Sequence, residues 1–501
     1  MWPTHEFSAQ VLINCVEESF GCLGGNPVDS YRFIYSNGVP DETCLPLTGT
    51  EEQCTPINQC RSCTDNNVCN PVYDYEKFSI SDYGILWSEK YMKAEIFYFG
   101  TITCEIGVTS SFRNYRGGIF MDDTGSVLYD HTVSVVGWGK ERNIAYWIVR
   151  NTWGTYWGEQ GFARVLRGYN ILGIESRCHW GSPSYQKRNN ATSSSSKSSS
   201  KSSMPLSSST SMKNKTQVVE ASREVGIHIR NFVSCGFPTD WTKTKPVVIS
   251  PLPSTYVNVS SLPYYWDIRN LHGRNYATPI KNQHSPLFCN SCWAQATATA
   301  LSDRLNLYNY GQWPTIELSA QSILNCASGT CVGGDTGDVY RLGYLQGIPD
   351  ETCQAYEGKK HECNSIDVCM DCDAYECWPV NDYRRVYVEE YGEVQGISNM
   401  KAEIYKRGPI TCFMVMTEEF MEYEGGIFVE TDHTYKGGHI VEVTGWGYDG
   451  QSNRHYWIAR NNWGNEWGEN GWFRIVMGGS NLMIETACSW GVPSFTRNSR
   501  S

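Results

Sequence analysis

A cysteine at position 292 lies in the sequence CNSCW (289–293), directly before the pattern of a helix. Apolar residues recur after it at the spacing of one helical face, at Ala294, Ala298, Leu301 and Leu305. We therefore predict a helix with Ser291 and Cys292 at its N-terminus and with its end near Gly311. Unpaired backbone N–H groups and the helix dipole lower the pKa of a thiol placed there, which makes it a better nucleophile. The pair Cys289-x-x-Cys292 alone is also compatible with a disulfide or a redox-active dithiol.

A thiolate nucleophile needs a proton-accepting partner, and histidine is the usual one. His439 opens the apolar run HIVEVTGWG, which predicts a strand whose end faces a cleft. Asn461 follows a second strand-like run, YWIAR, and Trp463 comes two residues later. An asparagine can orient an imidazole, and an indole can shield that hydrogen bond from water. Each residue alone is more often structural, but the order Cys, His, Asn indicates nucleophilic catalysis.

These residues resemble the papain family of cysteine peptidases, whose nucleophile lies in the signature C-G-[SA]-C-[WY]. CNSCW matches it except at Asn290, which stands in the glycine position. The resemblance implies an α+β papain-like fold with a helical left lobe and a β-rich right lobe. It implies Cys292 as the nucleophile, His439 as its ion-pair partner and Asn461 as the orienting amide. It further implies Gln283 as the oxyanion-hole donor, Trp463 as the shielding indole, and Gly333 with Gly334 as substrate-binding glycines.

Within that family, the chain is similar to the cathepsin X group of carboxypeptidases, which remove single C-terminal residues. Gln283 and Cys292 are nine residues apart, a longer spacing than most of the family has, and the extra residues begin at His284. The resemblance implies a mini-loop in which a protonated His284 binds the substrate's terminal carboxylate, most strongly at acidic pH. Ser285 and Leu287 depart from that group's loop, so an endopeptidase remains the alternative.

The stretch FVSCGFPTDW (232–241) resembles the propeptide of the same group. Its Cys235 is implied to form a reversible disulfide with Cys292, so that the protein's own propeptide acts as an inhibitor. Pairing of Cys235 with Cys22 is the alternative. We expect a maturation cut near 261–263 that detaches everything before it.

The chain is a tandem duplication. WPTHEFSAQVLINC (2–15) matches WPTIELSAQSILNC (313–326), and YWIVRNTWGTYWGEQGFARV (146–165) matches YWIARNNWGNEWGENGWFRI (456–475). The first copy keeps His131 and Asn151 as a degenerate site, but nothing in it matches 264–312, which holds the nucleophile. The expected units are a truncated first copy (1–185), a Ser/Lys-rich linker (186–220), a propeptide-like segment (221–262) and a complete second copy (263–495).

Two explanations of the first copy are open. Met1 can lie inside a longer protein whose first copy is complete and preceded by a signal peptide, which we favour because MWPTHEFSAQ has no signal-peptide pattern. Otherwise the first copy is a non-catalytic module that binds or regulates.

The chain of 501 residues contains 21 cysteines, a density typical of disulfide-stapled proteins from oxidising compartments. The cysteine cluster of 353–377 is therefore expected to form disulfides rather than a zinc site. Cys22 has no partner in this scheme. The pairs implied by the family are Cys289–Cys331, Cys326–Cys363, Cys353–Cys369, Cys372–Cys377, Cys412–Cys488, Cys15–Cys54, Cys44–Cys60, Cys63–Cys69 and Cys104–Cys178.

Composition excludes several other classes of protein. The net charge of -12 argues against nucleic-acid binding, and no apolar run approaches the roughly 18 residues of a membrane span. We expect peptide or protein substrates, no cofactor, no metal, and a lysosomal, endosomal or secreted location.

Three glycosylation sequons begin at Asn190, Asn214 and Asn258. Beside endopeptidase activity, the open alternatives are a catalytically inactive peptide-binding scaffold and, with little support, a thioredoxin-like oxidoreductase.

Overall fold

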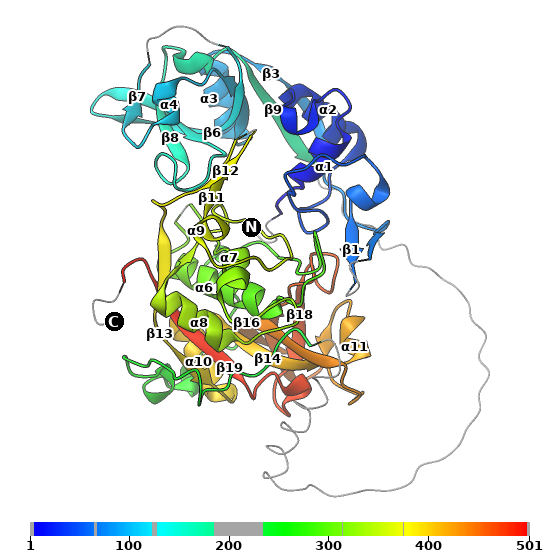
Figure 1. The fold of residues 1–501 in the computed structure, drawn as a ribbon. Coiled ribbons are helices and arrows are strands. Elements are labelled where there is room, and N and C mark those ends of the chain that lie inside the picture. The colour runs from blue at the N-terminus through cyan, green and yellow to red at the C-terminus, as the bar shows by residue number, and fades with distance from the viewer. Residues whose placement is uncertain are drawn as a thin grey trace, which may run out of the picture.

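The computed structural model describes residues 5–64, 68–122, 128–184, 234–312, 314–373 and 375–497. The Ser/Lys-rich linker, the first part of the propeptide-like segment, and the sequons at Asn190 and Asn214 lie outside the described residues. Each copy has its own helices and its own large sheet, coloured blue to cyan for the first copy and green to red for the second (Figure 1). Within the described ranges, no helix is long and apolar enough to cross a membrane.

The second copy combines a group of helices with one large, mostly antiparallel sheet. Its helices are α6 (Cys292–Tyr308), α7 (Ala320–Cys326), α8 (Thr336–Leu345), α9 (Ser365–Val368), α10 (Ile397–Arg407) and α11 (Glu418–Met421). Its strands are β10 (Ile348–Pro349), β11 (Met370–Cys372), β12 (Cys377–Pro379), β13 (Arg385–Val394), β14 (Ile410–Met416), β15 (Ile427–Phe428), β16 (Gly437–Asp449), β17 (Arg454–Arg460), β18 (Trp472–Val476) and β19 (Cys488–Ser494). The large sheet has the order β10-β13-β19-β14-β16-β17-β18-β15.

Helix α6 is the central element of the second copy and contacts β14, β16 and β19 of the sheet. The apolar stripe predicted from the sequence is buried, and so are the polar residues of the opposite face. Arg460 of β17 explains part of this burial, because its guanidinium lies 2.7 Å from Asp303 of α6 and 2.5 Å from Glu442 of β16. These buried ion pairs fix the helix against the sheet, and with it the residue that begins the helix, Cys292.

The first copy repeats this plan with fewer elements. Its helices are α1 (Ala9–Cys15), α2 (Pro27–Asn37), α3 (Glu89–Tyr98) and α4 (Ser110–Arg113). Its strands are β1 (Arg61–Cys63), β2 (Cys69–Pro71), β3 (Ser79–Leu86), β4 (Ile102–Ile106), β5 (Ile119–Phe120), β6 (His131–Glu141), β7 (Ile144–Arg150), β8 (Phe162–Leu166) and β9 (Cys178–Ser184). Its sheet has the order β3-β9-β4-β6-β7-β8-β5, and among its described residues nothing corresponds to α6.

All nine disulfides implied by the family resemblance are present in the structure. None of them joins the two copies, so each copy is cross-linked within itself. Cys22 is an exposed free cysteine, in agreement with the pairing scheme implied by the family for these residues. The tenth disulfide of the described residues belongs to the candidate site.

Candidate active site

Three side chains from different elements meet at the N-terminal end of α6. Cys292 begins the helix, His439 is the third residue of β16, and Asn461 directly follows β17. His439 Nε2 lies 2.8 Å from Asn461 Oδ1, and the His439 ring lies 4.8 Å from the Trp463 ring between centroids. The fold therefore brings together the residues that the sequence order singled out, with the indole beside the His–Asn hydrogen bond.

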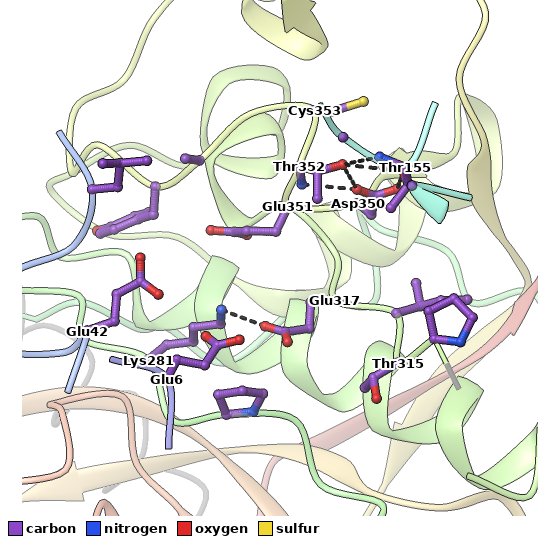
Figure 2. Close-up of a pocket in the computed structure, with 18 of the residues that line it drawn as sticks. Glu6, Glu42, Thr155, Lys281, Thr315, Glu317, Asp350, Glu351, Thr352 and Cys353 are labelled. Carbon is purple, nitrogen blue, oxygen red and sulfur yellow. Dashed lines mark hydrogen bonds and ion pairs between the residues drawn. The ribbon is translucent and has the colours of Figure 1, made fainter. Parts of the chain in front are cut away.

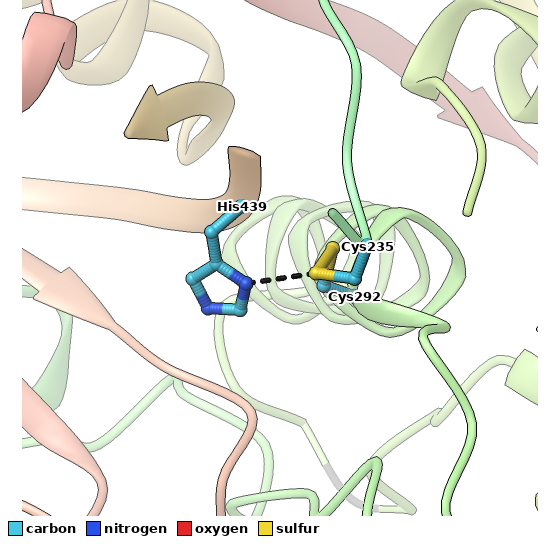
Figure 3. Close-up of side chains that lie close together, drawn as sticks. All are labelled: Cys235, Cys292 and His439. Carbon is cyan, nitrogen blue, oxygen red and sulfur yellow. Dashed lines mark hydrogen bonds between the residues drawn. A yellow bond between two sulfur atoms is a disulfide. The ribbon is translucent and has the colours of Figure 1, made fainter. Parts of the chain in front are cut away.

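The sulfur of Cys292 is bonded to Cys235 rather than free. The Sγ–Sγ distance is 2.10 Å, and Cys235 Sγ lies 3.0 Å from His439 Nδ1 (Figure 3). These three residues are also the one group of potential metal ligands found in the part of the chain that the structure describes. Both sulfurs are used in the disulfide, whereas a metal would need them as thiolates. The disulfide therefore blocks the sulfur of the candidate nucleophile.

Burial controls the protonation of His439. The residue is fully buried, and this burial lowers its pKa to about 4, although the hydrogen bond with Asn461 acts in the opposite direction. In the disulfide-bonded form the imidazole is therefore neutral at pH 5 and above. The expected thiolate–imidazolium pair is absent here, because the sulfur that would carry the negative charge is in a disulfide.

The segment around Cys235 runs between two glycine-containing stretches of the second copy. On one side, Gly334 N donates to Cys235 O at 3.2 Å and Phe237 N donates to Gly334 O at 3.0 Å. On the other side, Cys235 N donates to Gly438 O at 3.1 Å. A Cβ on Gly333 would lie 2.8 Å from Ser234 O, so this close approach requires glycine there. The segment occupies the backbone positions that the family resemblance assigns to substrate.

The candidate oxyanion-hole residue is held by a tyrosine that the sequence analysis missed. Tyr356 Oη donates to the backbone oxygen of Gln283 at 3.1 Å and pairs with Ser291 Oγ at 2.5 Å. Tyr356 thus joins the segment before the mini-loop to the N-cap of α6. Comparison of the two copies could have indicated this role, because the first copy has Leu47 at the position of Tyr356 in the second.

Replacing Tyr356 by phenylalanine should lower kcat more than it changes KM, because Gln283 and the start of α6 lose their common anchor. We expect kcat to fall about three- to tenfold, and stability to fall by about 1–3 kcal/mol because Ser291 keeps a buried unpaired hydroxyl. Steady-state kinetics and urea unfolding measure the two effects. Tyr340→Phe is the matched control, since its buried hydroxyl bonds with Thr411 at 3.0 Å away from the site. Equal kcat losses in both variants would contradict a positioning role.

His284 lies beside the nucleophile, but not in the charge state expected from the sequence. Its Nε2 is 3.1 Å from Gln283 Nε2, and its ring stacks on Phe288 at 4.9 Å between centroids. Loss of hydration, followed by repulsion from His439, lowers the pKa of His284 to about 3. With Cys235 bonded to Cys292, this lowered pKa favours a neutral His284 near pH 5, and the protonated His284 expected in the active form stays a prediction. A neutral ring that accepts the Gln283 N–H at Nε2 still carries a donor at Nδ1.

The first copy preserves half of the same arrangement. His131 Nε2 lies 2.8 Å from Asn151 Oδ1, and the His131 ring stacks on Trp153 at 4.7 Å. Burial lowers the pKa of His131 as it does for His439. Nothing in residues 1–185 aligns with Cys292, so these residues supply a candidate base and its orienting amide only.

Together, the helix-borne cysteine, the strand-borne histidine and the orienting asparagine define a papain-like thiol peptidase. The profile described as "Papain family cysteine protease" matches the chain twice, over residues 3–182 and 262–492. The chain therefore belongs to the papain family of cysteine proteases. The two matches agree with the duplication, and the predicted α+β papain-like fold is confirmed.

Two curated relatives show which members of the family the chain is similar to. Cathepsin Z of Onchocerca volvulus is 43% identical over 244 residues, which are 47% of this chain and 79% of that protein. Cathepsin B-like cysteine proteinase 6 of Caenorhabditis elegans is 30% identical over 240 residues, which are 43% of this chain and 62% of that protein. The predicted similarity to the cathepsin X group, also called cathepsin Z, is thereby confirmed.

Solved structures with a similar fold include procathepsin B S9 from Trypanosoma congolense, with a TM-score of 0.44 and 22% identity over 56% of this chain and 99% of that one. Digestive procathepsin L 3 of the Tenebrio molitor larval midgut has a TM-score of 0.41 and 23% identity over 53% of this chain and 78% of that one.

Proposed function

We propose that the second copy hydrolyses peptide bonds with Cys292 as its nucleophile, once Cys235 has left. The observation that carries this proposal is the placement of Cys292 at the start of α6, next to a histidine that is bonded to Asn461. A reductant thiolate that attacks Cys235 Sγ would release Cys292 as a thiolate beside His439. The negative sulfur would then favour protonation of His439 and form the ion pair that the disulfide prevents.

The remaining steps follow from the residues around this pair. The thiolate attacks the scissile carbonyl carbon, and the resulting oxyanion accepts hydrogen bonds from Gln283 Nε2 and the backbone N–H of Cys292. His439 then gives its proton to the leaving amine, while Asn461 keeps the ring in position. Water hydrolyses the thioester and restores the enzyme. The substrates are peptides or proteins, in a lysosomal, endosomal or secreted setting.

We further propose that the second copy removes single residues from C-termini. Support comes from the mini-loop that begins at His284 and from the cathepsin Z relative, which is 43% identical. A loop beside the nucleophile limits the space beyond the scissile bond. A neutral His284 can donate Nδ1–H to the terminal carboxylate, and such a hydrogen bond to a charged acceptor stabilises binding by about 1.5–3 kcal/mol.

Peptides with a free C-terminus should therefore be cleaved about 10- to 100-fold more efficiently than amidated ones, since each 1.4 kcal/mol is tenfold. Because the pKa of His284 is lowered to about 3, this preference should stay constant between pH 5 and pH 7, where both His284 and the substrate carboxylate keep their charge state. Measurements of kcat/KM on matched peptide pairs at both pH values test this. His284→Ala should remove the preference, and replacement of the exposed His433 should leave it unchanged.

Two results would lead to other conclusions. A preference that declines steadily above pH 6 would mean that His284 acts as a cation after Cys235 has left. Equal cleavage of free and amidated peptides by the wild type would identify an endopeptidase of the same fold and would refute the carboxypeptidase proposal.

A further inference from the structure

We propose that the first copy stays bound to the second after the connecting chain is cut, instead of detaching as expected from the sequence, and that it holds the leaving-group side of the catalytic cleft. Here the leaving-group side means two segments. One is 282–286, which contains Gln283, and the other is 464–466, which directly follows Trp463. The functional part of this inference rests on the proposed peptidase activity, whereas the binding part stands on the contacts alone.

Thr43 of the first copy contacts both of these segments. Asn282 Nδ2 donates to Thr43 O at 2.9 Å, directly before Gln283 in the sequence. Asn465 N donates to Thr43 Oγ1 at 3.1 Å, two residues after Trp463. One residue of the first copy thus joins the two stretches that carry the candidate oxyanion donor and the shielding indole.

The β1–β2 hairpin of the first copy contacts the mini-loop. It extends from the first copy toward the second in Figure 1, and Cys63 Sγ lies 3.4 Å from the backbone oxygen of Pro286. Cys63 is buried in this position. The loop that limits the space beyond the scissile bond is therefore supported from outside by the first copy.

The contacts recur in the opposite direction, with the roles of the copies exchanged. Thr352 corresponds to Thr43 in the repeated DETC motif, and Thr155 corresponds to Asn465. Thr155 N donates to Thr352 Oγ1 at 3.0 Å, which mirrors the bond between Asn465 and Thr43. The β11–β12 hairpin also extends toward the first copy, where loss of hydration and, after it, the nearby Asp371 raise the pKa of the Tyr156 hydroxyl. Such reciprocal contacts are the pattern of a two-fold, self-complementary interface.

Acidic residues of both copies surround one lysine at this interface (Figure 2). Lys281 Nζ lies 2.7 Å from Glu317, and Glu6 and Glu42 of the first copy line the same cavity of about 1450 Å³ together with Glu351. Loss of hydration, followed by repulsion from Glu317, raises the pKa of Glu6 to about 7, while Lys281 lowers it and Glu42 and Glu351 raise it further. The Glu6 side chain still reaches solvent within the cavity, so screening weakens the effect.

This charge arrangement gives binding between the copies a definite pH dependence. A carboxyl whose pKa is higher in the bound state favours binding when protonated, and this contribution is lost as the pH rises from its free value through its bound value. With allowance for screening, we expect the dissociation constant of the cut protein to rise about tenfold between pH 5 and pH 7.5. Burial also raises the pKa of Glu42 and raises that of Glu351 to about 7, so Glu6→Gln should remove only part of that rise.

The binding test uses the full chain with a protease site placed in the connecting chain within 187–216. After cutting, size-exclusion chromatography at pH 5 should return both copies in one peak, and Thr43→Arg should separate them. Because the interface is reciprocal, Thr352→Arg should separate them as well. Circular dichroism of each variant before cutting shows whether it is folded. Separation of the folded wild-type pieces at pH 5 would overturn the proposal.

A matched pair of smaller changes tests the functional part, in a Cys235→Ser background that needs no reductant. Thr43→Val and Thr352→Val each remove one hydroxyl acceptor at the interface. The Thr43 hydroxyl accepts from Asn465 of the second copy, whereas the Thr352 hydroxyl accepts from Thr155 of the first copy. We expect the preference for free over amidated C-termini to fall about two- to tenfold in Thr43→Val, the effect of one hydrogen bond, and to stay constant in Thr352→Val. Equal effects in both variants would overturn the positioning role. A chain whose copies co-elute but which hydrolyses no peptide would refute only the proposed activity.

Discussion

Replacement of Cys292 by alanine is expected to abolish peptide hydrolysis, with a fall in kcat/KM of about 10⁴-fold or more once Cys235 has been reduced or replaced. The physical reason is that the sulfur at the start of α6 is the group that would form the covalent bond to the substrate carbonyl. The equivalent change in the degenerate site, His131→Ala, should leave kcat/KM unchanged. Rates with a peptide substrate measure both effects.

An epoxide that alkylates active-site thiols gives a second measurement that does not depend on substrate turnover. It should label Cys292 in the reduced wild type, and labelling should fall strongly in His439→Ala, since the thiolate loses its partner. Appreciable hydrolysis by the Cys292→Ala protein would move the activity to another site. A reduced wild type that neither hydrolyses peptides nor reacts with the epoxide would identify the inactive, peptide-binding alternative.

Replacement of Cys235 by serine is expected to make activity independent of reductant. The unreduced wild type should be essentially inactive, because the Cys292 sulfur is bonded to Cys235. Glutathione should raise its rate about 100-fold or more as the thiol is released. In Cys235→Ser the backbone of the segment still contacts Gly334 and Gly438, so some inhibition without a covalent bond should remain. Rates measured with and without glutathione for both proteins give the comparison.

Mass spectrometry of the unreduced protein provides the direct counterpart of this experiment. Proteolytic digestion should yield a peptide pair linked through Cys235 and Cys292, with Cys22 recovered as a free thiol. A pair linking Cys235 to Cys22 would refute the latch. A wild type that is fully active without reductant would refute it as well.

Most of the candidate site could be predicted from the sequence, because its residues lie in local patterns. Cys292 begins a helical stripe, His439 lies near the start of an apolar strand, and Asn461 directly follows another. The role of Tyr356 could not be predicted in this way, since its hydroxyl meets Gln283 and Ser291 only through packing between distant segments. The same holds for Asp303 and Arg460, which look like solvated charges in sequence and form a buried pair in the fold.

The sequence by itself determined the duplication, the family, the cysteine pairing that the family implies and the order of the candidate catalytic side chains. All of these depend on residue identity and spacing. The tertiary structure alone decided the burial that lowers the pKa of His284 and the docking of Thr43 beside the candidate catalytic residues. Protonation depends on how much hydration a group loses and which charges surround it, and docking depends on surfaces built from residues far apart in the chain. Neither quantity is encoded in local periodicity, so both appear only when the chain is folded.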